Sequence, residues 1–268
     1  MPKFIGPDFD YELASDDELK QYLQRYGVHY SLNTILNMLE PESTKDKTIQ
    51  ILLGKFYQDK LKAPSSIPPP LFRHPIISID GFFTHGRTKV AKMVASALNG
   101  RRMLMPTRHI ARLRGYITDE TLRKQYYALA KYMGANMATL YCRTAPVILE
   151  RYWHDQVAYV IAKSFESKIS SNSSIYDFPK DLLVPDLMFF VTGALDPKEY
   201  NESTVVNHIN NEMALRIAEA SRKIRPKPIE IGPPSLPSTM VKKILAVVDQ
   251  FRHRFLSKPL HRPNWRNN

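Results

Sequence analysis

The stretch from His74 to Lys89 reads HPIISIDGFFTHGRTK, and it decides the fold that the sequence predicts. An apolar run, 76–79, leads into Gly81, and Gly86 precedes a segment expected to be helical. This spacing follows the phosphate-binding loop (P-loop) template of glycine, four residues, glycine, lysine, and serine or threonine, except that Arg87 replaces the lysine. The sequence therefore predicts a P-loop nucleotide fold with an altered cation.

The main chain of such a loop does most of the binding. Backbone N–H groups and the positive end of the following helix converge on one point, which attracts anions. Glycines allow a close approach that a side chain would block. We therefore expect the ATP phosphates to bind at Gly81, Thr84, His85, Gly86, Arg87 and Thr88, with Thr88 also ligating Mg²⁺.

Arg87 keeps the positive charge of the loop but changes its shape. A lysine ammonium is a compact charge, whereas a guanidinium is a wider planar fork with a different reach. Phe82 and Phe83 are also bulkier than the residues usual inside such a loop. The motif thus predicts phosphate binding and leaves open whether phosphate is still transferred.

Composition limits the class of protein and its partners. The 268 residues are 43% hydrophobic and 24% charged, as in an ordinary globular protein. The single cysteine, Cys142, cannot form an internal disulfide, and no apolar run approaches the roughly 18 residues of a membrane span. A net charge of +12 favours anionic partners such as nucleotides or nucleic acid. The acidic N-terminal 20 residues are unlike a mitochondrial transit peptide, so cytoplasm and mitochondrion both stay open, with the cytoplasm favoured.

The chain divides into four parts by composition. Residues 1–62 are expected to form a small helical N-terminal extension, with a capping box formed by Ser15 and Glu18. Residues 63–74 are a proline-rich linker, 75–257 the P-loop domain, and 258–268 a basic tail.

From residue 72 onward, predicted strands alternate with predicted helices. The strands are 76–79, 102–105, 147–150, 187–192 and 228–231, and the helices are 87–99, 119–141, 153–167, 203–224 and 238–255. Such alternation is typical of an α/β fold, here a P-loop kinase core with a five-stranded parallel sheet and helices on both faces. Ligands of open parallel sheets bind beyond the carboxyl ends of the strands, so residues at those ends are the candidates for function.

A second motif lies at such an end, in the stretch VILERYWHD from Val147 to Asp155. The apolar strand ends in a carboxylate, Glu150, and a guanidinium, Arg151. Arginine is suited to bidentate capture of a phosphate. We therefore expect Arg151 to hold a phosphate group, with Tyr152 or Trp153 packing on a base or ribose.

Three ordered motifs carry a resemblance to a known family. They are the run RYWH that begins at Arg151, the stretch DLLVPDL at 181–187, and the helix YYALAKYMGAN at 126–136. Together with the P-loop they resemble the thymidylate kinases, and most of all the mitochondrial UMP-CMP kinase branch of that family. The resemblance covers about 75–255, and the catalytic motifs are degenerate relative to the family pattern.

The resemblance implies a nucleoside monophosphate kinase that uses ATP and Mg²⁺ to phosphorylate a pyrimidine monophosphate such as UMP, CMP or dTMP. It implies catalytic roles for Arg87, Glu150 and Arg151, where Glu150 stands in for the family's aspartate. It also implies an acceptor-nucleotide site at Arg114, Tyr132, Arg151 and Tyr152. Thymidylate kinases commonly pair, so a homodimer is a further expectation.

Two functions from different classes remain open at this point. Phosphoryl transfer depends on positioned cations, yet the segment 193–210, where the family's lid should lie, has Lys198 and no arginine. Arg216, on the next predicted helix, is the first arginine that follows. The chain is therefore either a divergent active kinase or a catalytically impaired pseudokinase. In the second case it is a nucleotide-binding or structural module whose basic surface contacts a protein or nucleic acid.

Overall fold

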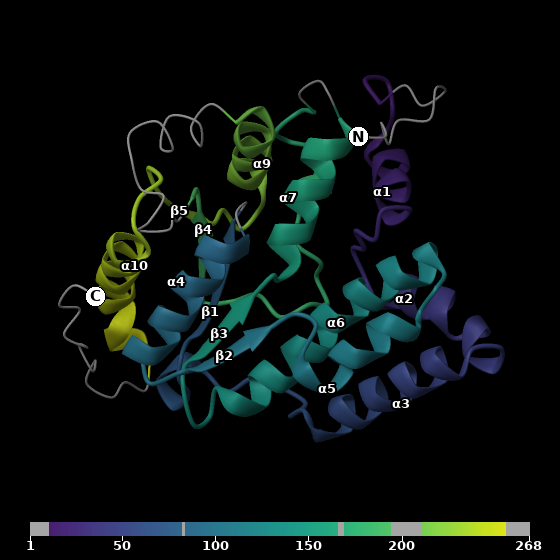
Figure 1. Cartoon of the computed structure of the whole chain (residues 1–268), viewed down its shortest axis with the longest axis horizontal. Helices are drawn as coiled ribbons and strands as arrows, with labels where there is room; N and C mark the ends of the chain where they lie inside the picture. Colours follow the sequence, from purple (N-terminus) through teal and green to yellow (C-terminus); the bar gives the residue numbers. More distant parts are fainter. Residues whose placement is uncertain (1–10, 82–83, 166–168, 194–210, 256–268) are drawn as a thin grey trace.

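The computed structural model describes residues 11–81, 84–165, 169–193 and 211–255. Its centre is a five-stranded, wholly parallel sheet (Figure 1). The strands are β1 (Ile76–Gly81), β2 (Arg101–Leu104), β3 (Val147–Glu150), β4 (Leu187–Val191) and β5 (Ile229–Ile231), in the order β2-β3-β1-β4-β5. The predicted α/β fold, with five parallel strands, is confirmed, and the end of β1 lies between the ends of β3 and β4.

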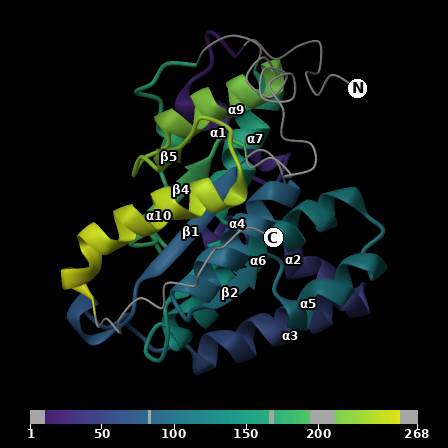
Figure 2. The ribbon, with the colours of Figure 1, turned by 60° about the vertical axis from the view of Figure 1, so that its left-hand side comes forward.

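Helices cover both faces of the sheet because alternate strand residues point to opposite sides. On one face, Ile77 and Ile79 of β1 pack with α4 (Thr84–Ala97) and α10 (Pro237–Phe251). On the other, Val147 and Leu149 of β3 belong to a larger core with α6 (Glu120–Tyr141), α7 (Trp153–Ser164) and α9 (Glu212–Lys223). The turned view in Figure 2 shows α4 and α10 together beside the sheet.

The N-terminal helices share this larger core. They are α1 (Asp16–Gln24), α2 (Leu32–Leu39) and α3 (Lys47–Lys62), and α3 lies along α6 in Figures 1 and 2. Buried Leu23, Ile35 and Phe56 join the same apolar cluster as α6. The predicted capping box is present, since the Ser15 hydroxyl accepts from the Glu18 amide and the Glu18 carboxylate accepts from the Ser15 amide. The division into extension, linker, domain and tail stays a prediction, although α1 to α3 have no core separate from that of α6.

Shorter elements complete the described part. They are the four-residue α5 (Arg108–Ala111) and the 3₁₀ turns η1 (Pro41–Thr44), η2 (Pro70–Phe72), η3 (Arg112–Tyr116), η4 (Ser174–Tyr176) and η5 (Arg252–Arg254). Within the described ranges, no helix combines the length and the apolar character that crossing a bilayer requires.

Candidate functional site

The P-loop turn begins where β1 meets β4. Gly81 ends β1 with φ 154°, and a Cβ at that position would lie 2.3 Å from the carbonyl oxygen of Val191 on β4. A side chain is therefore excluded by backbone atoms that cannot move aside. Helix α4 begins at Thr84, so a strand precedes the motif's second glycine and a helix contains it, as the motif predicts. Phe82 and Phe83 lie outside the described residues, as do the side chains of Thr84 and His85.

Arg87 turns inward and is engaged by the protein itself. Its side chain is 2% exposed, and its Nη1 donates to the carbonyl oxygen of Gly81 and to the carboxylate of Asp155 on α7. The Asp155 side chain is 25% exposed, so the ion pair lies just below the surface. The cation of the P-loop thus already has an anionic partner before any phosphate is present.

Glu150 occupies a second ion pair, on the face of the sheet that α4 covers. Its side chain is fully buried, and Arg102 of β2 donates to it from Nε at 2.8 Å and from Nη2 at 2.6 Å. The hydroxyl of Thr88 donates to the other carboxylate oxygen. The structure therefore brings together Thr88 and Glu150, which the sequence predicted separately, and adds Arg102 as the counter-charge.

Arg151 lies at the end of β3 in an unusual backbone conformation. Its φ of 61° is in the left-handed region, which costs a non-glycine residue about 1 to 3 kcal/mol. Its Nε is buried and makes no hydrogen bond among the described residues. The Nε donor of Arg151 is therefore free to bind a phosphate oxygen, and a guanidinium is suited to binding such a group.

Four further ionisable residues lie near Arg151, namely Asp80, Lys131, His154 and Asp155, and the sequence analysis assigned them no role. Asp80 of β1 accepts from the backbone N–H of Tyr152 at 3.0 Å, and its other oxygen lies 3.6 Å from Nδ1 of His154. Lys131 of α6 donates to the carbonyl oxygen of Arg151 at 2.7 Å. Asp155, which forms an ion pair with Arg87, also belongs to this group of residues. A carboxylate directly before the glycine turn was a usable signal for Asp80, whereas nothing in the sequence distinguishes Lys131.

Burial shifts the proton affinity of this group. It lowers the pKa of the Lys131 ammonium to about 8, although the nearby carboxylates of Asp155 and Asp80 favour the charged form. Burial also raises the pKa of the Asp155 carboxyl, while the Arg87 guanidinium acts in the opposite direction. The end of the sheet is thus a compact set of opposite charges with little water to screen them.

The other predicted site residues have partners within the fold. The hydroxyl of Tyr152 donates to the carbonyl of Leu183 at 2.8 Å, and that of Tyr132 donates to Asp181 at 2.8 Å. Both tyrosines are buried, whereas Arg114 is exposed on η3 and donates to the hydroxyl of Tyr127. Contact of these three residues with a nucleoside stays a prediction.

The segment expected to form the lid falls mostly on 194–210, outside the described residues. Arg216, the first arginine after it, donates to the carbonyl of Phe165 at the end of α7.

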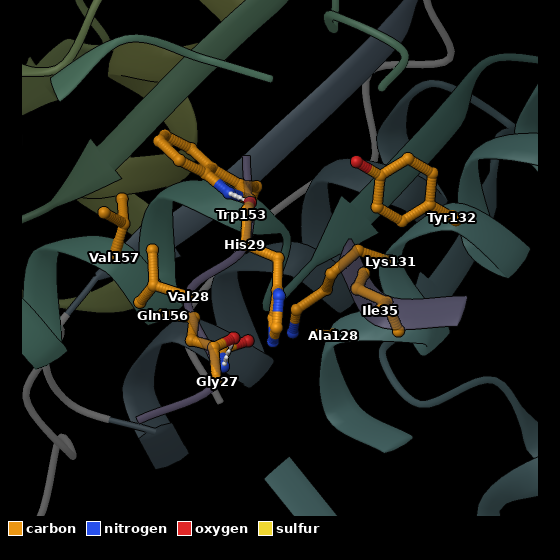
Figure 3. A pocket seen from close by; sticks show the side chains of 10 residues that line it. All are labelled: Gly27, Val28, His29, Ile35, Ala128, Lys131, Tyr132, Trp153, Gln156 and Val157. Carbon is orange, nitrogen blue, oxygen red and sulfur yellow. Dashed lines mark hydrogen bonds between the residues drawn. The ribbon is translucent and has the colours of Figure 1, made fainter. Parts of the chain in front are cut away.

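A small cavity lies between the segment before α2 and the helices α6 and α7. Its lining includes His29, Lys131, Tyr132, Trp153 and Gln156, and Figure 3 shows His29 and Lys131 pointing toward the same part of it. Its volume of about 10 Å³ suits roughly one water molecule. This cavity is too small for a nucleoside, so an acceptor base would have to bind elsewhere.

No family model matches the chain, and no curated protein matches it. One solved structure similar to this chain is a thymidylate kinase from Candida albicans, described as revealing the origin of broad substrate specificity. The similarity covers 70% of this chain and 97% of that kinase, with 13% identity and a TM-score of 0.45.

Proposed function

We propose that the chain is a nucleoside monophosphate kinase-like protein whose P-loop binds ATP with Mg²⁺ and whose Arg151 binds the phosphate of a pyrimidine monophosphate. The observation that carries the proposal is the buried Nε of Arg151, which has no hydrogen-bond partner among the described residues and lies at the strand end beside the glycine turn. The candidate acceptors are UMP, CMP and dTMP, on the strength of the sequence motifs shared with the UMP-CMP kinase branch.

The reaction would be an in-line transfer between two phosphates. A phosphate oxygen of the acceptor attacks the γ-phosphorus of ATP, the bond from that phosphorus to the bridging oxygen breaks, and ADP leaves. Protein groups contribute mainly by positioning the two phosphates and by neutralising the charge that spreads over the moving group. In this proposal Arg151 neutralises the acceptor phosphate and Arg87 the phosphates of ATP.

Magnesium would enter with the nucleotide. The local donors are oxygen atoms, which suit Mg²⁺, and Asp80 has a buried carboxylate oxygen with no hydrogen-bond partner in the described structure. The described residues contain no group of three His, Cys, Asp or Glu side chains that would hold a metal without help. The phosphates must therefore supply most of the ligands, with the Thr88 hydroxyl as the expected protein ligand once it leaves Glu150.

A second candidate function is a catalytically impaired nucleotide-binding or structural module. The ion pair between Arg87 and Asp155 favours it, because an arginine occupied by a carboxylate is not available to a γ-phosphate. In this case the net charge of +12 would serve contact with an acidic protein surface or a nucleic acid. The kinase and the nucleotide-binding form of the module share phosphate binding and differ in turnover, whereas the structural form binds no nucleotide.

The experiment that tests the proposal measures binding and turnover separately. Thermal shift with ATP and Mg²⁺, and with UMP, CMP or dTMP, should raise the melting temperature, because a ligand that binds only the folded state stabilises it. ADP release should then be followed in the wild type, in Arg87→Lys and in Arg151→Ala, with Arg222→Ala, a surface arginine, as the control.

Turnover that Arg151→Ala abolishes and Arg222→Ala leaves intact supports the kinase. Binding without turnover, even in Arg87→Lys, supports the impaired module. The absence of any shift with every nucleotide refutes the kinase and the nucleotide-binding module, and leaves only the structural module.

A further inference from the structure

We propose that Lys131 and Asp80 are positioning residues that grip the peptide unit between Arg151 and Tyr152 and thereby aim the Arg151 guanidinium at the acceptor phosphate. The inference rests on the proposed function, because it concerns how the phosphate-binding arginine of that same site is held. Asp80 lies in the quoted stretch 74–89 and Lys131 in the helix 126–136, but the sequence analysis assigned a role to neither.

Both ends of one peptide unit are bound. The carbonyl oxygen of Arg151 accepts from Lys131 at 2.7 Å, and the N–H of Tyr152 donates to Asp80 at 3.0 Å. These two groups belong to the same rigid plane, because the bond that joins them cannot rotate freely. The plane is therefore fixed relative to α6 on one side and β1 on the other.

The grip explains why Arg151 keeps a conformation that other residues avoid. With φ at 61°, Arg151 interrupts the alternation of β3 and sends its side chain in a direction that a continuing strand would not allow. Strained residues persist where their surroundings fix them, and here a cation and a carboxylate do so from opposite sides. If the grip is released, the backbone is expected to relax and the guanidinium to turn away.

The hydrogen bond to the Arg151 carbonyl accounts for the burial of Lys131. The residue is 6% exposed on a helix whose other buried positions are mostly apolar, and it has no carboxylate within 4.0 Å among the described residues. A buried ammonium is costly unless it makes strong hydrogen bonds. The carbonyl of Arg151 accepts such a hydrogen bond from Lys131. An apolar residue at position 131 would leave that carbonyl without its donor.

The test is a double-mutant cycle in which calorimetry measures the affinity for two ligands, a nucleoside monophosphate and ADP with Mg²⁺. Lys131→Met should weaken binding of UMP, CMP or dTMP about tenfold or more, since a charge-assisted hydrogen bond is lost and Arg151 is released. Binding of ADP with Mg²⁺, which does not need Arg151, should change less than about twofold. Lys124→Met on the same helix, where the lysine lies 3.5 Å from Glu120 near the surface, is the matched control.

The cycle separates an indirect role from a direct one. If Lys131 acts through Arg151, Lys131→Met has no further effect on monophosphate binding in the Arg151→Ala background. Effects that add instead mean that Lys131 acts on its own, and they overturn the proposal. Equal loss of both ligands, or no loss of either, overturns it as well.

Hydrogen exchange tests the grip without any nucleotide. The Tyr152 amide should exchange at least tenfold faster in Lys131→Met than in the wild type, while the Lys124→Met variant leaves it unchanged. Unchanged exchange in Lys131→Met refutes the grip. If the wild type binds no monophosphate but exchange is still faster in Lys131→Met, the proposed function is refuted and the grip stands, so the two failures are distinguishable. If Lys131→Met does not fold, Lys131→Gln serves for the same measurements.

Discussion

Arg87 and Asp155 form an ion pair that joins the first turn of α4 to the first turn of α7. The carboxylate of Asp155 thus binds the cation that, in the P-loop motif, is expected to bind a nucleotide phosphate. Any nucleotide that uses Arg87 must therefore exchange with Asp155. This competition links the strength of nucleotide binding to the strength of a bond inside the protein.

Asp155→Asn should strengthen binding of ADP with Mg²⁺ while weakening the fold. Without the carboxylate, Arg87 no longer has to leave an anionic partner, and we expect a gain in affinity of about fivefold, or about 1 kcal/mol. The unpaired buried guanidinium should lower the free energy of unfolding by about 3 kcal/mol. Calorimetry and urea denaturation measure the two effects, with Glu230→Gln as a surface-pair control. Weaker ADP binding in Asp155→Asn would show that Asp155 supports the nucleotide instead of competing with it.

Arg102→Met should destabilise the protein far more than removal of a surface arginine. Glu150 is fully buried, and Arg102 is its cationic partner. Removing that partner leaves a buried charge uncompensated, at a cost of about 3 to 5 kcal/mol in the free energy of unfolding. Arg222→Met, which breaks the more exposed pair with Glu230, should cost less than about 1 kcal/mol. Urea denaturation of both variants checks the difference, and similar values for the two would mean that Glu150 is not held by Arg102.

Tyr132→Phe separates a structural role for this tyrosine from a role in nucleoside binding. The substitution keeps the ring and removes the hydroxyl that donates to Asp181, whose other oxygen accepts from the amide of Leu32 at the start of α2. We expect a loss of about 1 to 2 kcal/mol in the free energy of unfolding and no change in monophosphate affinity. Tyr57→Phe, a tyrosine bonded to exposed Glu40, is the control for stability. A clear fall in monophosphate affinity would instead confirm the predicted acceptor contact of Tyr132.

The sheet could be predicted from the sequence because its strands are nearly continuous apolar runs. The predicted 147–150 matches β3 at both ends, and 187–192 exceeds β4 by one residue. Buried parallel strands need such runs, and the glycine turn after β1 fixes the first connection. Helix α5 was missed because four residues are too few to show helical periodicity. The predicted start of α9 at 203 cannot be compared, since 194–210 lie outside the described residues.

The partners within the site could not be predicted in the same way. Glu150 and Arg151 were found because they follow an apolar strand, but their bonds to Arg102 and Lys131 join segments that are far apart in the chain. Asp155 stood inside the quoted motif, yet its pairing with Arg87 depends on how α7 is placed against α4. Local patterns indicate which residues reach a strand end. They do not indicate which of those residues neutralise one another.

Acid should destabilise the protein through His29, which lines the small cavity beside α6. Burial lowers the pKa of His29 to about 4, so the folded state keeps the imidazole neutral. An unfolded histidine has a pKa near 6.5, so the stabilisation is fully present above about pH 6.5 and is lost as the pH falls toward 4. Between pH 7.5 and 5.0 the wild type should lose about 2 kcal/mol more stability than His29→Gln, because the unfolded chain alone takes up this proton.

Urea denaturation at pH 7.5, 6.0 and 5.0 measures that difference for wild type and His29→Gln. His253→Gln provides the control, because His253 is exposed on η5 and its removal should leave the pH dependence of the wild type intact. Addition of ligand is unnecessary, so the result does not depend on any proposed activity. Parallel curves for wild type and His29→Gln would mean that the imidazole is hydrated in the folded state, and that the segment before α2 opens readily from α6.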